Sequence, residues 1–354
     1  MLSPLNTTAS QPLAGISILD LSRLLPGPMA TLMLADMGAH VTKIEEPGGD
    51  PARAIGPAAP GMPSHFFQLA NRGKTLLRLD FKQAAQREQF LSMVERADVV
   101  IESFRPGVMA RLGLGWDTLK ARNPQLVLCS ISGYGQNGPM AAMAGHDINY
   151  LASAGILEQI AGTNGKPVLP NLQIADLLGG AQTAVQGVLA ALLAVKMGGS
   201  GRCVDVSMSH ASFGCHVMPL VAVKSTGQSA APGLDLLTGG VACYNIYRTA
   251  DARFMAVGAL ELKFWEVFCS VIGRSDLAPR HWTRGQPVGG TEAQSDIEEL
   301  GRLFATHDLA YWTALFADAD CCVSPVLRTD EALRSGLFAT NADDVLGNGI
   351  KFLF

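Results

Sequence analysis

The sequence predicts an α/β protein: a large doubly wound, Rossmann-like domain followed by a smaller α+β domain. Its 354 residues are enough for two domains, at roughly 100–200 residues each. Short apolar strands alternate with helices over the first 135 residues, as in an open parallel sheet. Residues 225–240 are rich in Gly, Ser and Pro, as linkers often are. We therefore expect a large domain over residues 1–224, a linker over 225–240 and a small domain over 241–335.

The first strand–helix–strand unit begins at Ile16–Leu21, an apolar run typical of a buried strand. Pro26–Pro28 opens a helix over 29–37, because proline is tolerated where the first helical N–H groups have no partner. Gly38 ends this helix, and a second strand follows at 41–44. The same reasoning predicts strands at 75–79, 99–101 and 126–131 and a helix at 84–96.

The small domain is expected to begin with a hairpin. Residues 243–249 and 254–260 alternate in polarity, and 249–253 forms the turn between them. Helices are predicted at 262–272, 291–306 and 309–316, and residues 148–223 of the large domain are mostly helical in pattern. The last residues, 336–354, are expected to return toward the large domain in a shortened segment.

The composition excludes several classes of protein. Hydrophobic residues make up 48% of the chain and charged residues 16%, which excludes general disorder. The net charge of −4 leaves no basic excess for a nucleic-acid partner. The seven cysteines form no CxxC pair, so no disulfide framework or metal site is expected. Reduced cysteines and a first segment unlike a signal peptide fit a cytoplasmic location.

Two charge-free runs, 177–195 and 206–223, raise the question of membrane spans. The first contains glutamines and glycines, and the second contains serines and histidines. We interpret both as buried helices of a large core, so no membrane partner is expected.

Gly133–Gly138 matches the GxGxxG pattern of dinucleotide-binding loops and follows an expected strand. Such a loop should open a helix, but Pro139 follows directly and the apolar run ends at Gly145. A plain glycine turn is the favoured interpretation. An NAD-dependent dehydrogenase stays as a rival hypothesis, which a titration with NADH would test.

Four polar groups in apolar or glycine-rich surroundings are candidates for acid–base chemistry: His146, Asp147, Asp176 and Glu261. A buried carboxylate needs a partner or a raised pKa, and either makes it a candidate acid or base. Each group also has a structural interpretation. His146 would be a satisfied buried histidine, and the carboxylates would cap or charge the first turn of a helix.

Several motifs together resemble the family III CoA-transferases (the CaiB/BaiF type) and, within them, the α-methylacyl-CoA racemases. The resemblance covers residues 12–330, and the order and spacing of the motifs are highly specific. The motifs are Leu13-Ala-Gly-Ile, Pro26-Gly-Pro28, Glu45-Glu-Pro-Gly-Gly-Asp-Pro51, Asn71-Arg-Gly-Lys74, Leu79-Asp-Phe-Lys82, Glu102-Ser-Phe-Arg-Pro-Gly107, Gly133-Tyr-Gly-Gln-Asn-Gly-Pro139, Gly145-His-Asp-Ile-Asn-Tyr150 and Leu237-Thr-Gly-Gly240.

The resemblance implies an enzyme that moves a proton at C2 of a 2-methylacyl-CoA through an enolate. His146, oriented by Glu261, would serve one face of that carbon, and Asp176 beside Asp147 would serve the other. N–H groups near Asp147 would stabilise the enolate oxygen. The alternative is a CoA-transferase in which Asp176 forms an anhydride with the acyl group, although residues 237–240 hold fewer glycines than such transferases carry. A CoA-binding scaffold without catalysis is a third interpretation.

The resemblance also implies which residues hold the CoA part of the substrate, and it implies no separate cofactor. These are Leu79, Asp80, Phe81, Lys82, Ser103, Phe104, Arg105, Arg111, Gly145 and Tyr150, with Arg72 and Lys74 as further candidates. Arginine suits phosphates because its planar fork binds two oxygens. Where some racemases carry an arginine after the second strand, this chain has Glu46. Members of the family form interlocked dimers, so a homodimer is expected.

Overall fold

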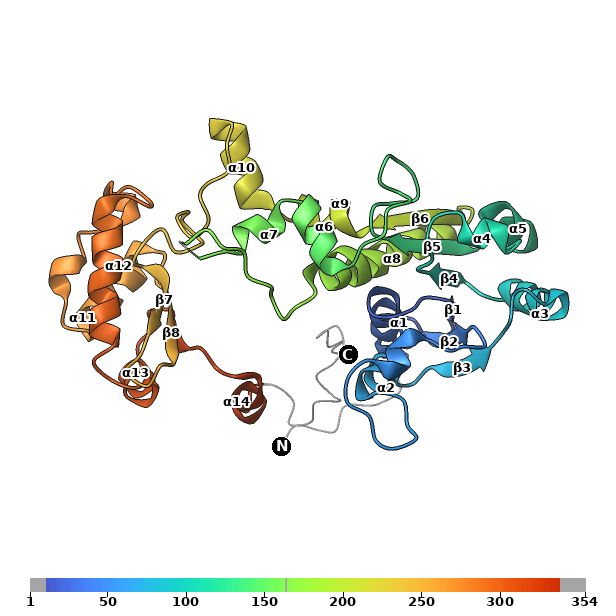
Figure 1. Ribbon diagram of the computed structural model, residues 1–354, viewed down its shortest axis with the longest axis horizontal. Helices are drawn as coiled ribbons and strands as arrows, with labels where there is room; N and C mark the ends of the chain where they lie inside the picture. The colour runs from blue at the N-terminus through green and yellow to red at the C-terminus, as the bar shows by residue number, and fades with distance from the viewer. Residues whose placement is uncertain (1–10, 163, 338–354) are drawn as a thin grey trace. The chain divides into compact units, whose positions relative to one another are not determined.

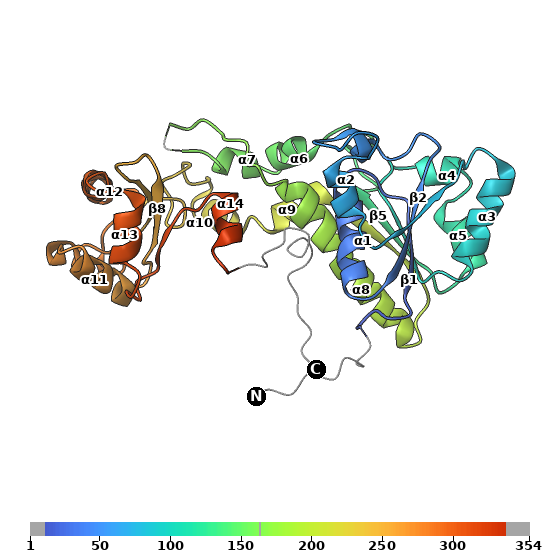
Figure 2. The same cartoon turned by 90° about the horizontal axis from the view of Figure 1, so that it is seen from below.

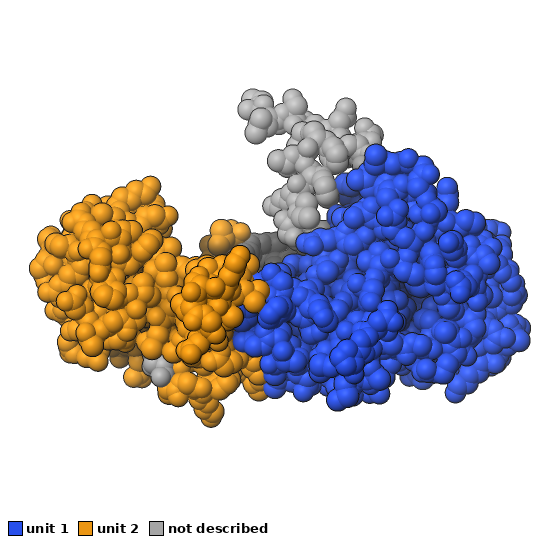
Figure 3. All heavy atoms as spheres, turned by 90° about the horizontal axis from the view of Figure 1, so that it is seen from above, with its two compact units in different colours: residues 1–156, 170–216, 341–354 blue, residues 157–169, 217–340 orange. Residues whose placement is uncertain are grey.

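The computed structural model describes residues 11–162 and 164–337 (Figure 1). The described chain divides into two compact units, one of residues 11–156 and 170–216 and the other of residues 157–162, 164–169 and 217–337 (Figure 3). This division falls after residue 216, whereas the expected large domain runs to 224, and it groups 157–169 with the second unit. From residue 338 onward, the expected return segment lies outside the described residues.

The first unit is built on a six-stranded parallel sheet with the order β3-β2-β1-β4-β5-β6. The strands are β1 (Ser17–Asp20), β2 (His40–Glu45), β3 (Thr75–Arg78), β4 (Val99–Glu102), β5 (Val127–Ser132) and β6 (Arg202–Ser207). The chain moves outward from β1 to β3 and then returns to the other side of β1 at β4, which confirms the doubly wound topology.

Helices cover both faces of this sheet, α1 (Pro26–Asp36) and α8 (Thr183–Lys196) on one side and α3 (Ala84–Val94) and α5 (Trp116–Arg122) on the other (Figure 2). Phe90 of α3 and Leu119 of α5 are buried in one cluster with Leu128 of β5. Strands covered on both faces read as continuous apolar runs, which is why the sequence located most of them. The shorter elements are η1 (Pro51–Ala54), α2 (His65–Ala70), α4 (Val108–Arg111), α6 (Asp147–Ser153), α7 (Ile156–Gln159), η2 (Ala175–Gln182) and α9 (Met208–Gly214).

The prediction that the two charge-free runs, 177–195 and 206–223, are buried helices fits the first run better than the second. The continuous helix Ala175–Lys196 is, among the described residues, the one helix long and apolar enough to cross a membrane by length and composition. Its first part, η2, packs against α1 and α9, and α8 packs against β5 and β6, as expected for a core helix. The interpretation of 206–223 as a buried helix is confirmed in its middle part, where α9 has Met208, Ser209 and Ser212 buried and packs against η2. It is wrong at both ends: the start of the run completes β6, and its end lies in α10 (Val217–Thr226), which has no buried residue.

The second unit contains a three-stranded antiparallel sheet with the order β7-β8-β9. Its strands are β7 (Tyr244–Arg248), β8 (Phe254–Gly258) and β9 (Val323–Pro325), and its helical elements after α10 are α11 (Leu262–Val271), η3 (Ser275–Leu277), η4 (Trp282–Arg284), α12 (Thr291–Phe304), α13 (Leu309–Leu315) and α14 (Thr329–Arg334). The predicted hairpin is present, and a core of stacked aromatic rings includes Phe268, Phe304 and Phe316.

Candidate active site

An open pocket of about 440 Å³ lies in the first unit at the carboxyl ends of β4 and β5. Ligands of open parallel sheets bind at this edge, near the point where the strand order reverses. Seven of the predicted site residues line it: Ser103, Phe104, Arg105, Gly145, His146, Tyr150 and Asp176. The structure therefore brings together the candidate acid–base groups of the large domain and part of the expected CoA-binding set.

His146 stands directly before α6, and its side chain reaches the pocket. Its backbone N–H donates to Oδ1 of Asn149 at 3.0 Å, which fixes the start of the helix. The Tyr150 hydroxyl, one turn further on, donates to the carbonyl of Gly145 at 2.5 Å. Because His146 is exposed, the structural interpretation of a satisfied buried histidine does not hold.

Asp147 and Asp176 are adjacent carboxylates with different partners. Oδ1 of Asp147 accepts the backbone N–H of Asp176 at 3.0 Å, so Asp147 holds the start of η2 as well as belonging to α6. Among the described residues, the carboxyl group of Asp176 accepts no hydrogen bond that would make it a helix cap. Burial first, and then the negative charge of Asp147, raise the pKa of Asp176 to about 7.

The segment that carries Asp176 is π-helical. π-helices are rare in proteins, and those that occur are often found at functional sites. Its two glycines are required by close packing. A Cβ at Gly179 would stand 2.4 Å from the carbonyl oxygen of Met208, and a Cβ at Gly180 would stand 2.8 Å from Cβ of Pro26. The glycine pair thus lets η2 lie tightly between α1 and α9. The sequence predicted a helix here but held no sign of its wider turn.

The loop after β4 presents Ser103 and Arg105 to the pocket. Its backbone is tied to the strand end, because Phe104 N–H donates to the Glu102 carboxyl group at 2.7 Å. Burial raises the pKa of Glu102 to about 7, against the effect of its hydrogen bonds. Arg105 is exposed and forms no ion pair within the described part of the chain, so its guanidinium is available to an anion.

A second pocket, of about 290 Å³, is lined by Asp80, Phe81 and Lys82 together with Glu46 and its neighbours. The side chains of the predicted CoA-binding run 79–82 alternate between the core and the pocket. Leu79 and Phe81 are buried in the core, where Phe81 packs edge-on against Phe90. Asp80 and Lys82 are the polar members at the pocket, and Lys82 N–H donates to Oδ1 of Asp80 at 3.0 Å.

Three predicted basic residues lie outside both pockets. Arg72 forms a two-pronged contact with Asp36, at 3.1 Å to each oxygen. Arg111 is exposed at the end of α4. Lys74 is fully buried, and its ammonium group contacts one carboxylate and three neutral oxygens, those of Asp20, Pro28, Thr31 and Asn71. Since all of its donors are engaged inside the protein, Lys74 is a structural residue.

Glu261 belongs to the second unit and stands directly before α11. Its carboxylate makes no capping hydrogen bond to that helix, although it occupies the capping position. The structural interpretation of Glu261 as a helix cap therefore has no support in its contacts.

Sequence reasoning missed three polar residues of the first pocket, Arg23, Ser132 and Asn149. Arg23 follows β1 and Ser132 ends β5 at the carboxyl edge of the sheet, and this position was the signal available for these two. Ser132 is only 7% exposed, and its hydroxyl group has no hydrogen-bond partner within the described residues. The neighbouring Gly133 is explained by packing, because a Cβ there would stand 2.3 Å from the ring of Tyr150. No helix follows it before α6, as expected for a plain turn.

Comparison with known proteins identifies the class. The chain matches CoA-transferase family III over residues 13–343. It is 35% identical to the human alpha-methylacyl-CoA racemase over 323 residues, which is 91% of this chain and 79% of the relative. The protein belongs to CoA-transferase family III.

Other relatives carry transferase names. The chain is 36% identical to a probable fatty acyl-CoA transferase of Mycobacterium tuberculosis, covering 94% of this chain and 86% of the relative. It is 33% identical to the acetyl-CoA:oxalate CoA-transferase of Acetobacter aceti, covering 91% and 82%. A solved structure of a CaiB/BaiF family protein from Brucella suis shares the fold with a TM-score of 0.83 at 24% identity, covering 97% of this chain and 93% of the other.

Proposed function

We propose that the protein is an acyl-CoA racemase or epimerase that transfers a proton at C2 of a 2-methylacyl-CoA thioester. The observation that carries this proposal is the placement of His146 and Asp176 in one pocket, on two different elements. A racemase needs one group to remove the C2 proton and a second to deliver a proton to the opposite face. With a pKa raised to about 7, Asp176 is suited to either role near neutral pH.

The proposed reaction passes through an enolate of the thioester. Negative charge then develops on the thioester oxygen, and donors placed beforehand at that oxygen lower the barrier. Backbone N–H groups at the start of α6, beside Asp147, are the proposed donors. The proposal involves no cofactor, since CoA is part of the substrate.

The proposed role of Glu261 is to orient His146, either from the second unit of the same chain or from a partner subunit. The latter fits an interlocked homodimer. In support, α10 is apolar yet exposes Val217 by 57% and Val221 by 52%, a pattern expected of a surface that another chain covers. Light scattering at micromolar concentration should give a dimer, and a monomer would contradict this part of the proposal. A cytoplasmic location and no membrane or nucleic-acid partner are proposed with it.

A CoA-transferase is the second candidate. Asp176 favours it, because its carboxylate, placed in the pocket, could attack the thioester carbonyl, break the C–S bond, release the CoA thiolate and leave an anhydride with the acyl group. The two relatives with transferase names described above also favour it. Loss of activity on Asp176→Ala is expected of both enzymes and does not separate them.

The deciding experiment is incubation of one enantiomer of a 2-methylacyl-CoA in D₂O without a second acid. A racemase incorporates deuterium at C2, seen by mass spectrometry, and the configuration is lost. Absence of exchange would reject the racemase. An acyl-enzyme at Asp176 that hydroxylamine traps would favour the transferase, because proton transfer at C2 forms no covalent intermediate.

His146→Ala provides the matching variant. In a racemase it should abolish racemisation, because one face of C2 loses its acid–base group. In a transferase it should leave part of the acyl transfer intact, since Asp176 carries that reaction.

A further inference from the structure

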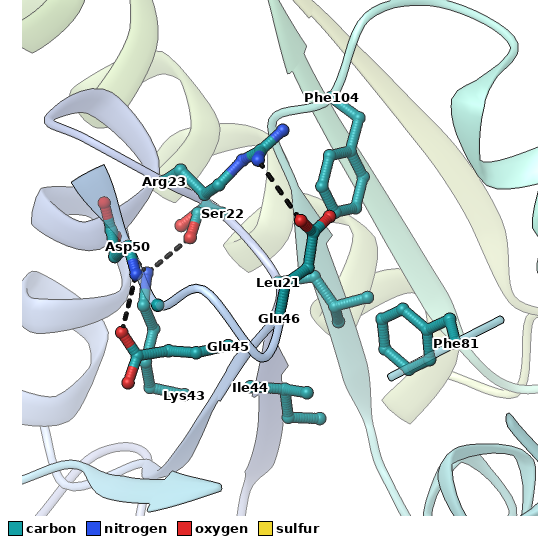
Figure 4. A pocket seen from close by; sticks show the side chains of 11 residues that line it. Leu21, Ser22, Arg23, Lys43, Ile44, Glu45, Glu46, Asp50, Phe81 and Phe104 are labelled. Carbon is teal, nitrogen blue, oxygen red and sulfur yellow. Dashed lines mark hydrogen bonds and ion pairs between the residues drawn. The ribbon is translucent and has the colours of Figure 1, made fainter. Parts of the chain in front are cut away.

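Arg23 and Glu46 form an ion pair on the lining of a narrow cleft in the first unit (Figure 4). The cleft is lined by Arg23 and Phe104, which also line the pocket of His146 and Asp176. The same cleft is lined by Glu46 and Phe81, which also line the pocket of Asp80 and Lys82. The three hollows therefore lie in series within the first unit, with the ion pair in the middle.

The backbone at Arg23 and Leu24 accepts support from side chains of two other segments. Arg23 N–H donates to Oγ of Ser103 at 2.9 Å, and Leu24 N–H donates to Oδ1 of Asp50 at 3.1 Å. Leu24 has a φ of 65°, a conformation that a branched residue seldom adopts without support. Asp50 in turn pairs with the fully buried Lys43 at 2.9 Å. This strained and well-supported loop fixes where the arginine side chain begins.

The side chain of Arg23 is, by contrast, held loosely. Its guanidinium lies 4.9 Å from the ring centroid of Phe104, a cation–π contact that leaves the N–H fork open at its edge. The contact with Glu46 is long, at 3.7 Å, and the two side chains are 39% and 48% exposed. Exposed pairs of this kind contribute little to stability. An anion with more charge and better geometry can therefore replace Glu46.

The proposed substrate supplies such an anion in the right place. The cleft itself, of about 10 Å³, is too small for a diphosphate, but the Arg23–Glu46 pair on its lining is exposed. A CoA whose thioester lies near His146 and whose nucleotide end lies near Asp80 and Lys82 must carry its diphosphate past this pair. We infer that Arg23 binds the diphosphate of the acyl-CoA and that Glu46 is the counter-ion it leaves when the substrate binds. The inference rests on the proposed acyl-CoA substrate, racemase or transferase alike.

The test is calorimetric binding of four ligands to the full chain: pantetheine, 4′-phosphopantetheine, 3′-dephospho-CoA and CoA. Arg23→Met should weaken binding of 3′-dephospho-CoA and CoA equally, by about 10- to 100-fold, because a charge-assisted contact is lost. It should weaken 4′-phosphopantetheine less and leave pantetheine unchanged. Glu46→Gln should tighten CoA by up to about fivefold, since the competing carboxylate is removed.

Arg122→Met is the matched control, because Arg122 pairs with Glu88 and Glu95 and lines none of the three hollows. This variant should bind all four ligands as the unchanged chain does. Equal CoA binding by Arg23→Met and the unchanged chain would overturn the inference alone. A loss confined to CoA would also overturn it, since that result assigns Arg23 to the 3′-phosphate. No binding of CoA by the unchanged chain would overturn the proposed function together with the inference.

Discussion

Burial opposes the ionisation of two carboxylates of the first unit, Asp20 and Asp176, but only Asp20 has partners that offset this effect. Asp20, at the end of β1, is fully buried and receives hydrogen bonds from Ser22 N–H at 2.9 Å and the Thr31 hydroxyl at 2.6 Å. Lys74 lies at 3.3 Å from it. Burial opposes ionisation of Asp20, but the charges of Lys43 and Lys74 outweigh burial and lower its pKa.

Asp176 has none of these compensations. Its charged neighbour is Asp147, of the same sign, and burial and that charge together raise its pKa to about 7. A buried group with every partner in place stabilises the fold, whereas one left without partners is held ready for a ligand or a proton. The comparison therefore separates a structural aspartate from a candidate functional one by their contacts, whereas the sequence shows only an aspartate in apolar surroundings in both cases.

The sharpest test of this contrast is Asp176→Asn. The substitution keeps the shape of the side chain and removes its acid–base function, so the C2 exchange rate should fall about 10²–10⁴-fold. Stability in urea should be unchanged or higher, because a poorly solvated charge is removed. An exchange rate within about threefold of the unchanged chain would break the functional half of the comparison.

Asp20→Asn should do the opposite. Removing one partner of a buried pair leaves Lys74 without its counter-charge, whereas Lys43 keeps Asp50, and a loss of about 3–5 kcal/mol in the free energy of unfolding is expected. Urea denaturation measures the loss, and the exchange rate per folded molecule should stay the same. Because the folded-state pKa of Asp20 is lowered, its contribution is present above its ordinary pKa and is lost as pH falls through the lower value. Asp20→Asn should therefore flatten the acid limb of the stability profile.

Much of the fold could be predicted from sequence, and the exceptions have a common cause. Strands covered on both faces, such as β1 and β4, form short apolar runs between glycines and prolines and are found readily. β6 is an edge strand with Arg202 exposed at its start, and β9 has three residues, so neither produces such a run. Low burial thus removes the periodic signal on which the prediction depends.

Residues of the candidate site could be predicted where a reactive side chain lay within a recognised motif. They could not be predicted where packing alone determines whether a side chain is buried or reaches the pocket. His146 and Asp176 lie far apart in the sequence and meet in one pocket because β5, α6 and η2 converge on one sheet edge. Lys74 looked like a phosphate ligand because a basic residue in a glycine motif carries no mark of burial. Arg23 was missed for the converse reason: its role depends on the conformation of Leu24 and on Phe104, which the sequence does not display.

The third test concerns the packing that presents Asp176. Gly179→Ala places a methyl group against the Met208 carbonyl, and this overpacking should cost about 1–3 kcal/mol of stability. Displacement of η2 should also lower the exchange rate, by up to about 10²-fold. Gly301→Ala is the control: nothing lies within 4 Å of the place on α12 that its new methyl group would take, and about 1 kcal/mol of added stability with no change in rate is expected. Equal behaviour of the two variants would show that Asp176 does not depend on the glycine contact.

The smallest expected effect is that of removing the negative charge of Asp147, which lies beside Asp176. In Asp147→Asn the amide oxygen can still accept the Asp176 N–H, so the position of η2 is kept while the negative charge is lost. The pKa of Asp176 should then fall, because burial alone continues to raise it. The limb of the pH–rate profile for C2 exchange that belongs to Asp176 should move to lower pH, with little change in the maximal rate. Asp117→Asn, on α5, should leave the limb in place. If the limb does not move in Asp147→Asn, burial alone raises the pKa of Asp176, without a contribution from the Asp147 charge. The difference between Asp20 and Asp176 would then come from the partners of Asp20 and not from the like charge beside Asp176.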